Sequence, residues 1–264
     1  MCRSKGVSVI DPRAIIEPGA QLADDVTVGP WSYIGADVVI GAGTEIASHV
    51  VIKGPTVMGS GNRVFQFSTI GEECQDKKYA GEPTRLEIGD NNVFREGTTV
   101  HRGTIQDQSL TKIGSHNLFM VNAHIAHDCM VGDHIILANN VALAGHVHVG
   151  DHTILGGFTA VHQFCHIGSH VMCGAGTVVL KDIPAYVMAT GNPAQPHGIN
   201  AEGLKRRGFT PEMIRGIRQA YKTIYRKKLT TVEALAVLEA EVVDSPEIDL
   251  LIASLKDSTR GIIR

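Results

Sequence analysis

Two histidines and an aspartate lie close together in the sequence, in the run Asn122-Ala123-His124-Ile125-Ala126-His127-Asp128-Cys129. An unperturbed imidazole has a pKa of about 6.5, so one of these histidines could take a proton from a hydroxyl group at neutral pH. A neighbouring carboxylate could orient that imidazole. The same residue types also bind metal ions, so the surroundings must decide between a catalytic base and a metal site.

Apolar residues recur at every sixth position on both sides of this run. One series extends from Ile10 to Ile70 and another from Ile113 to Val179, and a small or β-branched residue usually lies two positions earlier. A period of six fits neither an α-helix nor a simple strand. It is typical of the hexapeptide form of the parallel β-helix, in which short strands and turns alternate. We therefore predict a mainly β fold, with a parallel β-helix over residues 1–190.

With three hexads per coil, residues 18 apart should stack, in coils separated by about 4.8 Å. His127, Gly145 and Gln163 would then form one column that offers a base, an unobstructed backbone N–H and an amide. Such an N–H could stabilise the oxyanion of an acyl-transfer intermediate. No serine or cysteine nucleophile joins the column, which favours direct attack by a bound hydroxyl group. The residues expected beside it are His124, Asp128, His146 and His162.

Other interpretations of the histidines remain open at this point. His124, His127 and His146 could together ligate zinc between subunits. A nucleotide-sugar binding module without catalysis would use most of the same residues. A purely structural β-helix, such as an ice-binding scaffold, should show flat ranks of threonine and no insertions, unlike this sequence. The histidines expected at the surface are His134, His148, His152, His166 and His170.

The six-residue register breaks twice, over about residues 71–87 and 104–112. Both segments are polar, so we expect loops that project from a corner of the coil. Long insertions into a strict repeat are often functional.

The repeat ends near Ala185 and is followed by a turn-rich link over residues 190–196. Helices are then expected to begin after Thr210, at Thr231 and after Ser245, because proline follows Thr210 and Ser245 as at many first helical turns. The second of these should end near Val243. We therefore predict a C-terminal α-helical domain over residues 191–264.

Composition narrows the functional classes further. A net charge of −3 gives no general reason to expect binding to nucleic acid or membranes. No apolar run follows the first six residues, so we expect no signal peptide, and the apolar runs are too short for an integral membrane segment to be expected. The five cysteines lack paired CxxC spacing, and Cys129, Cys165 and Cys173 fall at interior repeat positions. Reduced cysteines in a cytoplasmic protein are expected.

Six segments, taken in order, resemble those of one family: residues 75–84, 101–104, 122–129, 144–147, 161–165 and 203–209. The sequence resembles the bacterial UDP-N-acetylglucosamine O-acyltransferases of lipid A synthesis, which belong to the hexapeptide-repeat acyltransferases. The resemblance implies a left-handed coil and a homotrimer with active sites between subunits. It also implies a 3-hydroxyacyl donor on acyl carrier protein and the 3-hydroxyl of UDP-N-acetylglucosamine as acceptor, with no cofactor or metal.

The resemblance also assigns roles to residues. His127 matches the general base, Asp128 the residue that orients it, and Gly145 the oxyanion donor. Asp76, Lys78 and His124 match contacts to the sugar, and paired arginines suit a pyrophosphate. The full set of expected substrate contacts is Gln75, Asp76, Lys78, His101, His124, His146, His162, Gln163, Asn200, Glu202, Arg206 and Arg207.

Two further features bear on the donor. Ala175 stands where some relatives have a glycine that admits a long chain, so it is the expected acyl-length position. Between Lys205 and Lys228 lie nine basic residues and one acidic residue, a surface that could steer an acidic carrier protein. The alternative enzyme is the N-acyltransferase of the same pathway, but that protein has an extra N-terminal domain, whereas this repeat begins by Ile10.

Overall fold

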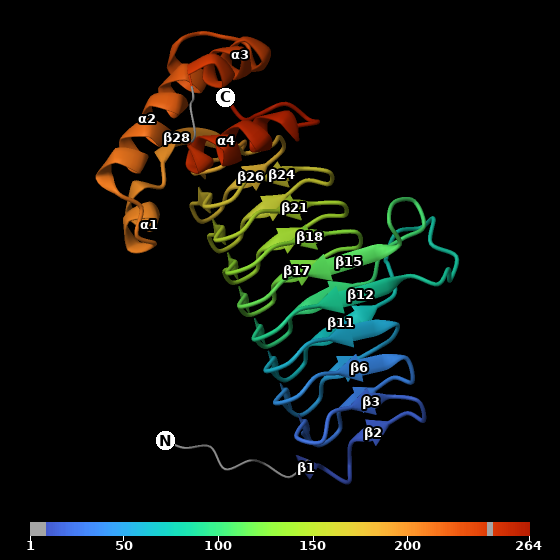
Figure 1. The fold of residues 1–264 in the computed structure, drawn as a ribbon. Helices are drawn as coiled ribbons and strands as arrows, with labels where there is room; N and C mark the ends of the chain where they lie inside the picture. Colours follow the sequence, from blue (N-terminus) through green and yellow to red (C-terminus); the bar gives the residue numbers. More distant parts are fainter. Residues whose placement is uncertain (1–8, 242–244) are drawn as a thin grey trace.

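The structure, a computed structural model, describes residues 9–241 and 245–264 (Figure 1). The chain winds through three sheets in turn, which we call sheets A, B and C, so that each coil contributes one short strand to each sheet. Sheet A contains β1 (Val9–Ile10), β4 (Thr27–Val28), β7 (Glu45–Ile46), β10 (Arg63–Val64), β13 (Val93–Phe94), β16 (Leu118–Phe119), β19 (Ile136–Leu137), β22 (Ile154–Leu155), β25 (Met172–Cys173), β27 (Val187–Thr190) and β28 (Gln195–Ile199).

The other two sheets complete a triangular column. Sheet B contains β2 (Ile15–Ile16), β5 (Tyr33–Ile34), β8 (Val51–Ile52), β11 (Thr69–Glu72), β14 (Thr99–His101), β17 (His124–Ile125), β20 (Ala142–Leu143), β23 (Ala160–Val161) and β26 (Val178–Val179). Sheet C contains β3 (Gln21–Leu22), β6 (Val38–Ile40), β9 (Thr56–Met58), β12 (Arg85–Ile88), β15 (Leu110–Ile113), β18 (Met130–Val131), β21 (His148–Val149) and β24 (His166–Ile167). Turns between the sheets form three edges, named A–B, B–C and C–A.

The register between coils confirms three hexads per coil. Ile125 pairs with Leu143, and Leu143 pairs with Val161, so residues 18 apart are hydrogen-bonded neighbours. The sixth-position residues fill the interior, where Ile52 and Ile125 are fully buried, while those at the N-terminal end are more exposed. Because each coil contacts only the coils before and after it, this packing is nearly one-dimensional.

Cysteines and asparagines complete the interior. Cys129, Cys165 and Cys173 are buried and free, as predicted, whereas Cys2 lies outside the described residues. At the C–A edge, the Asn92 side-chain nitrogen donates to the Gly114 carbonyl at 2.9 Å, and its oxygen accepts from the Asn117 N–H at 3.0 Å. Such side chains satisfy turn groups that would otherwise be buried without partners.

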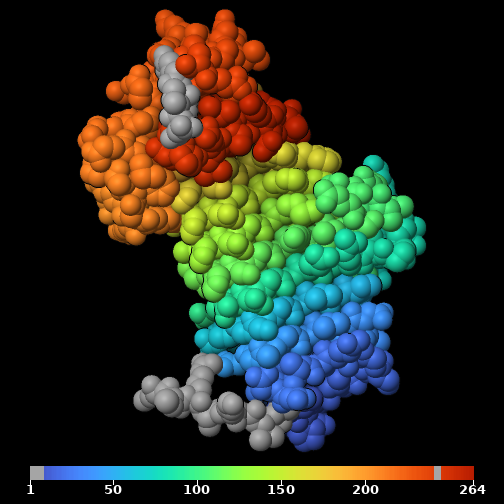
Figure 2. Space-filling view, in the orientation of Figure 1, coloured from blue at the N-terminus to red at the C-terminus, as the bar shows by residue number. Residues whose placement is uncertain are grey.

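Both insertions leave the column at the B–C edge. Residues 73–84 connect β11 to β12, and residues 102–109 connect β14 to β15. Both loops are shorter than the predicted breaks in the register, because the residues after each loop form four-residue strands. These strands, β12 and β15, pair with each other along their whole length. In Figures 1 and 2 these loops project from one side of the column.

The described part of the C-terminal segment forms four helices. They lie at one end of the column (Figures 1 and 2). They are α1 (Ala201–Arg206), α2 (Pro211–Arg226), α3 (Thr231–Glu241) and α4 (Pro246–Lys256). The predicted second helix begins at Thr231 as expected, and its predicted end at Val243 lies outside the described residues. Within the described ranges, no helix is both long and apolar enough to cross a membrane.

The link between column and helices contains the expected turn, at residues 191–194, but two strands that were not predicted flank it. β27 pairs in parallel with β25, so sheet A continues beyond Ala185, and β27 then forms an antiparallel hairpin with β28. The six-residue helix α1, which follows the hairpin, was not predicted. A segment this short carries too little periodicity to be detected in the sequence.

We expect Asn92→Leu to destabilise the column. The substitution removes two donated hydrogen bonds and one accepted hydrogen bond. The Asn62 Oδ1 keeps a bond from the Asn92 backbone N–H, but the Gly114 carbonyl and the Asn117 N–H are left buried without partners, at about 1–3 kcal/mol for each group. Thermal unfolding at fixed protein concentration would measure the loss. Asn91→Gly is the matched control because Asn91 is exposed and has a φ of +56°, which glycine adopts freely. Equal unfolding temperatures for the two variants would contradict the assignment.

Candidate active site

The B–C edge brings the chemically active side chains together. His127 and Asp128 lie in the turn between β17 and β18, and both insertions leave the same edge from the two preceding coils. Asp128 has a φ of +57°, a left-handed conformation that aspartate tolerates better than most residues. The edge therefore combines a rigid turn with two polar loops.

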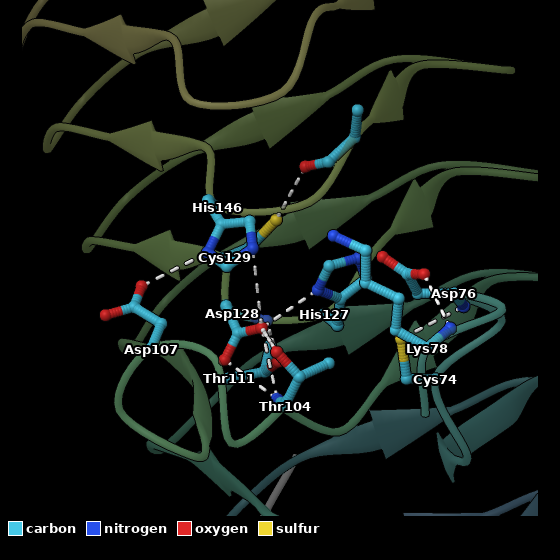
Figure 3. Close-up of polar contacts among 11 residues, drawn as sticks. Cys74, Asp76, Lys78, Thr104, Asp107, Thr111, His127, Asp128, Cys129 and His146 are labelled. Carbon is cyan, nitrogen blue, oxygen red and sulfur yellow. Dashed lines mark hydrogen bonds and ion pairs between the residues drawn. The ribbon is translucent and has the colours of Figure 1, made fainter. Parts of the chain in front are cut away.

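His127 and Asp128 form a direct hydrogen bond. The His127 Nδ1 lies 2.8 Å from the Asp128 Oδ2 (Figure 3). An ionised carboxylate can only accept, so the hydrogen is on Nδ1 and the Nε2 of the neutral ring keeps its lone pair. The Asp128 side chain is fully buried, whereas 13% of the His127 side chain is exposed. His127 can therefore act as a base toward a bound ligand.

The Asp128 carboxylate is held by the second insertion as well. Thr104 donates its N–H to both carboxylate oxygens, at 2.9 and 3.1 Å, and its hydroxyl to Oδ2 at 2.6 Å. Burial by itself would raise the pKa of Asp128, but the hydrogen bonds from His127 and Thr104 outweigh it and hold the pKa below the usual value. The Asp128 N–H donates to the Thr111 hydroxyl at 2.8 Å. Sequence reasoning assigned neither threonine as a partner of Asp128. Thr104 lies in an insertion that no repeat describes, and Thr111 lies in β15, directly after that insertion has broken the register.

Gly145 stacks beside His127, as the spacing predicts. A Cβ atom at Gly145 would lie 2.5 Å from the His127 ring, so only glycine leaves room for the imidazole. Among the described residues, no acceptor is found for the Gly145 N–H. Gln163 continues the column one coil further, and both Gln163 and His162 are exposed. The edge thus presents a base and a free N–H side by side.

His146 is the second imidazole at this edge. Its ring stacks on Phe164 at 4.4 Å between centroids and meets the His127 ring edge-on at 5.1 Å. Its Nδ1 lies 3.2 Å from the Asp107 Oδ2, and its Nε2 lies 3.8 Å from the Asp128 Oδ2 (Figure 3). Asp107, from the second insertion, was not among the predicted site residues.

The first insertion lies on the other side of His127. Figure 3 shows Asp76 and Lys78 beside that ring, and the Lys78 N–H donates to the Asp76 carboxylate at 2.9 Å. Gln75 Nε2 lies 3.5 Å from His124 Nε2, and the His101 ring meets the His124 ring edge-on at 5.1 Å. The residues that the resemblance assigned to substrate contacts on β14, β17 and the first insertion therefore lie close to one another and to His127.

The surroundings of His124 favour the neutral form of its imidazole. Burial, followed by the proximity of His101 and His127, lowers its pKa to about 4. Its Nδ1 lies 2.7 Å from the Thr99 hydroxyl. Burial is also the main cause that lowers the pKa of His101. A neutral imidazole can both donate and accept a hydrogen bond, so His101 and His124 suit contact with an uncharged polar ligand.

The residues that could hold a metal ion differ from the predicted set. The potential ligand atoms of His127, Asp128 and His146 lie within 4.8 Å of one another, and His124 is not in this group. However, the His127 Nδ1 and the Asp128 oxygens bond to each other and to Thr104 instead of facing a common point. The hydrogen-bond network accounts for this arrangement of side chains.

The expected nucleotide contacts lie at a different edge. Asn200, the N-cap of α1, donates its side-chain N–H to the His170 carbonyl at 3.0 Å, and Arg207 donates to the His152 carbonyl at 2.8 Å. His152 and His170 are in turns of the C–A edge. Glu202 and Arg206 are exposed on α1 and form an ion pair at 3.3 Å.

Ala175 lies at the third edge. It is exposed in the turn between β25 and β26, which is part of the A–B edge. One chain therefore does not bring Ala175, the α1 residues and His127 together.

One surface expectation was wrong. His170 is buried, with 8% exposed, because it stacks between His152 and Tyr186 and meets Phe209 edge-on. The stack also includes His134, while His148 stacks on His166 at 4.4 Å. The stacked histidines are 18 residues apart, one coil, so the repeat itself indicates that their rings lie against each other.

A parallel column of hexads with a histidine–carboxylate pair at its edge defines a transferase of the hexapeptide-repeat class. Residues 19–54 match the family model described as bacterial transferase hexapeptide (six repeats). Residues 182–263 match the model described as UDP-N-acetylglucosamine O-acyltransferase, domain 2.

Whole-chain comparisons are more specific. The acyl-[acyl-carrier-protein]–UDP-N-acetylglucosamine O-acyltransferase of Stutzerimonas stutzeri is 59% identical over 98% of this chain and 100% of that protein. The corresponding protein of Aeromonas salmonicida is 62% identical over 90% of this chain and 91% of that protein. The solved structure of LpxA from Acinetobacter baumannii is 56% identical with a TM-score of 0.95, and covers 97% of this chain and 100% of that chain.

The chain belongs to the UDP-N-acetylglucosamine O-acyltransferase family. The structure of the Francisella novicida UDP-N-acetylglucosamine acyltransferase, 41% identical, has the same TM-score of 0.95 and covers 97% of this chain and 94% of that chain. The predicted fold class, a left-handed parallel β-helix followed by helices, is confirmed.

The low pKa of His124 makes stability depend on pH. Between about pH 6.5 and about pH 4 the unfolded chain takes up a proton at this residue before the folded chain does, so the free energy of unfolding should fall as the pH is lowered through this window. His170, with a pKa of about 4, contributes in the same direction. Denaturant unfolding at several pH values would measure the slope.

His124→Gln should flatten this dependence, whereas His162→Gln, at an exposed site, should leave it unchanged. An identical slope in wild type and His124→Gln would show that His124 is not held neutral by the fold.

Proposed function

We propose that this protein transfers a 3-hydroxyacyl chain from acyl carrier protein to the 3-hydroxyl of UDP-N-acetylglucosamine, the first step of lipid A synthesis. The observation that carries the proposal is the His127–Asp128 pair at 2.8 Å, placed beside the free N–H of Gly145. The family's name specifies the donor and acceptor classes, and this pair supplies the chemistry that such a transfer needs.

The mechanism follows from the directions of these groups. The His127 Nε2 takes the proton of the sugar hydroxyl as its oxygen attacks the thioester carbonyl. Asp128, ionised and buried, stabilises the imidazolium that forms and keeps its orientation. The Gly145 N–H donates to the developing oxyanion. When the tetrahedral intermediate collapses, the C–S bond breaks and His127 returns the proton to the departing thiolate of the carrier.

The substrates are placed by the elements around the pair. Asp76, Lys78 and His124 face the sugar from the first insertion and β17, and His146, His162 and Gln163 continue along the edge toward the acyl chain and the nucleotide. Ala175 sets the acyl length. A methyl group is larger than the hydrogen of glycine, so it shortens the space at that position.

The donor is recognised on α2. Arg215, Arg218 and Lys222 are exposed, and their spacing of three and four residues places them on one face of the helix. A positive surface of this kind steers an acidic carrier protein into productive encounter. Because the donor is acyl carrier protein, the reaction takes place in the cytoplasm.

The active unit is a homotrimer. His127, the α1 residues and Ala175 occupy three different edges of one column, so a complete site requires a neighbouring copy. Sheet A also presents a row of outward-facing apolar side chains that a neighbour would cover, namely Leu118, Ile136, Ile154, Met172 and Met188. A cyclic arrangement would set the B–C edge of each column against sheet A and α1 of the next.

The decisive experiment measures acyl transfer to UDP-N-acetylglucosamine from acyl carrier proteins loaded with 3-hydroxyacyl chains of several lengths. Wild type and His127→Ala are compared after treatment with a chelator. His127→Ala should lower kcat by at least about 100-fold, because it removes the general base. Chelation should leave wild-type activity unchanged. The matched control is His49→Ala, an exposed histidine on the A–B edge near the N-terminal end.

Retained activity in His127→Ala would rule out this base, and loss of activity after chelation would favour a metal mechanism. Transfer to a 3-amino sugar in preference to the 3-hydroxyl would change the assigned acceptor group and leave the proposed general base in place. Wild type without transfer from any donor would contradict the assigned substrates.

Mixed trimers test the division of the site between subunits. His127→Ala and Arg206→Glu should each be inactive alone, because one lacks the base and the other repels the pyrophosphate. When the two are co-expressed, each mixed trimer should regain about one site in three, at the boundary where both residues are intact. Isolated mixed trimers as inactive as their parents would place the whole site in one subunit.

A further inference from the structure

A second carboxylate–imidazole pair adjoins the catalytic one. Asp107 in the second insertion lies with its Oδ2 3.2 Å from the His146 Nδ1 (Figure 3). The same insertion sends Thr104 to the Asp128 carboxylate. One short loop therefore contacts both the aspartate that supports the base and the imidazole beside that aspartate.

Asp107 determines how the His146 ring is turned. The ring is nine-tenths buried, and its stacking on Phe164 at 4.4 Å fixes the plane of the ring. Stacking does not distinguish a nitrogen edge from a carbon edge, because a half-turn of the ring preserves it. A carboxylate at 3.2 Å does, since it accepts a hydrogen bond only from Nδ1–H. The side chain of Asp107 is 35% exposed, and within the described residues its hydrogen-bond partner on the column is His146.

The orientation of His146 matters to Asp128. The His146 Nε2 is 3.8 Å from the Asp128 Oδ2, beyond hydrogen-bond distance, whereas the His127 Nδ1 is 2.8 Å from the same oxygen. Two imidazoles thus border one carboxylate oxygen. With its hydrogen on Nδ1, the neutral His146 ring has only a lone pair at Nε2 and cannot donate to Asp128. If the hydrogen moved to Nε2, a small rotation of the ring toward Asp128 would give that oxygen a second donor and weaken its bond to His127.

We infer that Asp107 is a positioning residue for the transfer reaction: it holds the Nδ1–H of His146 and so keeps the Asp128 carboxylate hydrogen-bonded to His127. The inference rests on the proposed function, because its effect on rate is exerted through the general base. Asp107 touches neither substrate nor reacting atoms in this account.

Steady-state kinetics provide the first test. Asp107→Ala should lower kcat on the order of tenfold, as for one hydrogen bond to a charged group, and leave KM for UDP-N-acetylglucosamine nearly unchanged. Asp107→Asn should restore most of kcat, because its side-chain oxygen still accepts from Nδ1–H. Gln108→Ala is the matched control, an exposed neighbour in the same loop, and should behave as wild type.

A double-mutant cycle separates this role from a general effect on the loop. In a His146→Ala background, Asp107→Ala should cause no further loss of kcat, because the residue through which it acts is gone. A further loss of similar size would show that Asp107 acts through the fold of the insertion, and would overturn the inference. So would a wild-type kcat in Asp107→Ala alone.

A second measurement does not depend on activity. In nitrogen-15 NMR spectra of the full-length protein, the His146 signals, identified by their loss in His146→Ala, should move in Asp107→Ala and stay in place in Gln108→Ala. Unchanged signals in Asp107→Ala would overturn the inference. A wild type that transfers no acyl group would defeat the proposed function alone, and these signals would still decide whether Asp107 orients His146.

Discussion

Parallel hydrogen bonding between successive coils is the constraint on which the rest of the molecule depends. The His146 N–H donates to the His127 carbonyl at 3.0 Å, and the Phe164 N–H to the Gly145 carbonyl at 3.1 Å, so the turn of each coil rests on the turn before it. This register is what puts Gly145 beneath the His127 ring. A glycine one position earlier or later in the sequence would leave the imidazole against a side chain.

Most of the column could be predicted from the sequence, because the six-residue period of apolar residues follows directly from the hydrogen bonding between coils. The pairing of Ile125 with Leu143 follows from counting, and so does the stack of His127, Gly145 and Gln163. Thr104 and Asp107 could not be placed, because they lie in an insertion whose path is set by contacts and not by a repeat. The proton arrangement at Asp128 depends on those same contacts, so its chemistry was less predictable than its position.

The shape of the column also explains why the expected site residues do not all lie close together within one chain. A triangular prism keeps its three edges apart, and His127, Arg207 and Ala175 are on different ones. Sequence resemblance assigns residues to a site without saying which copy of the chain supplies each of them. The geometry of one chain adds that information, since residues on separate edges can meet only across a boundary between columns.

The uniform spacing of the coils has a consequence for how such proteins can change size. Arg207 is bound to a turn carbonyl beside His152, which lies more than one coil after His127, so the separation of α1 from the base along the column is set by the spacing of about 4.8 Å between coils. Gain or loss of one 18-residue coil between them would preserve every turn and shift α1 by one complete step. Insertion or deletion of whole coils can therefore change the distance between α1 and the base only in steps of about 4.8 Å, and finer changes must come from side chains.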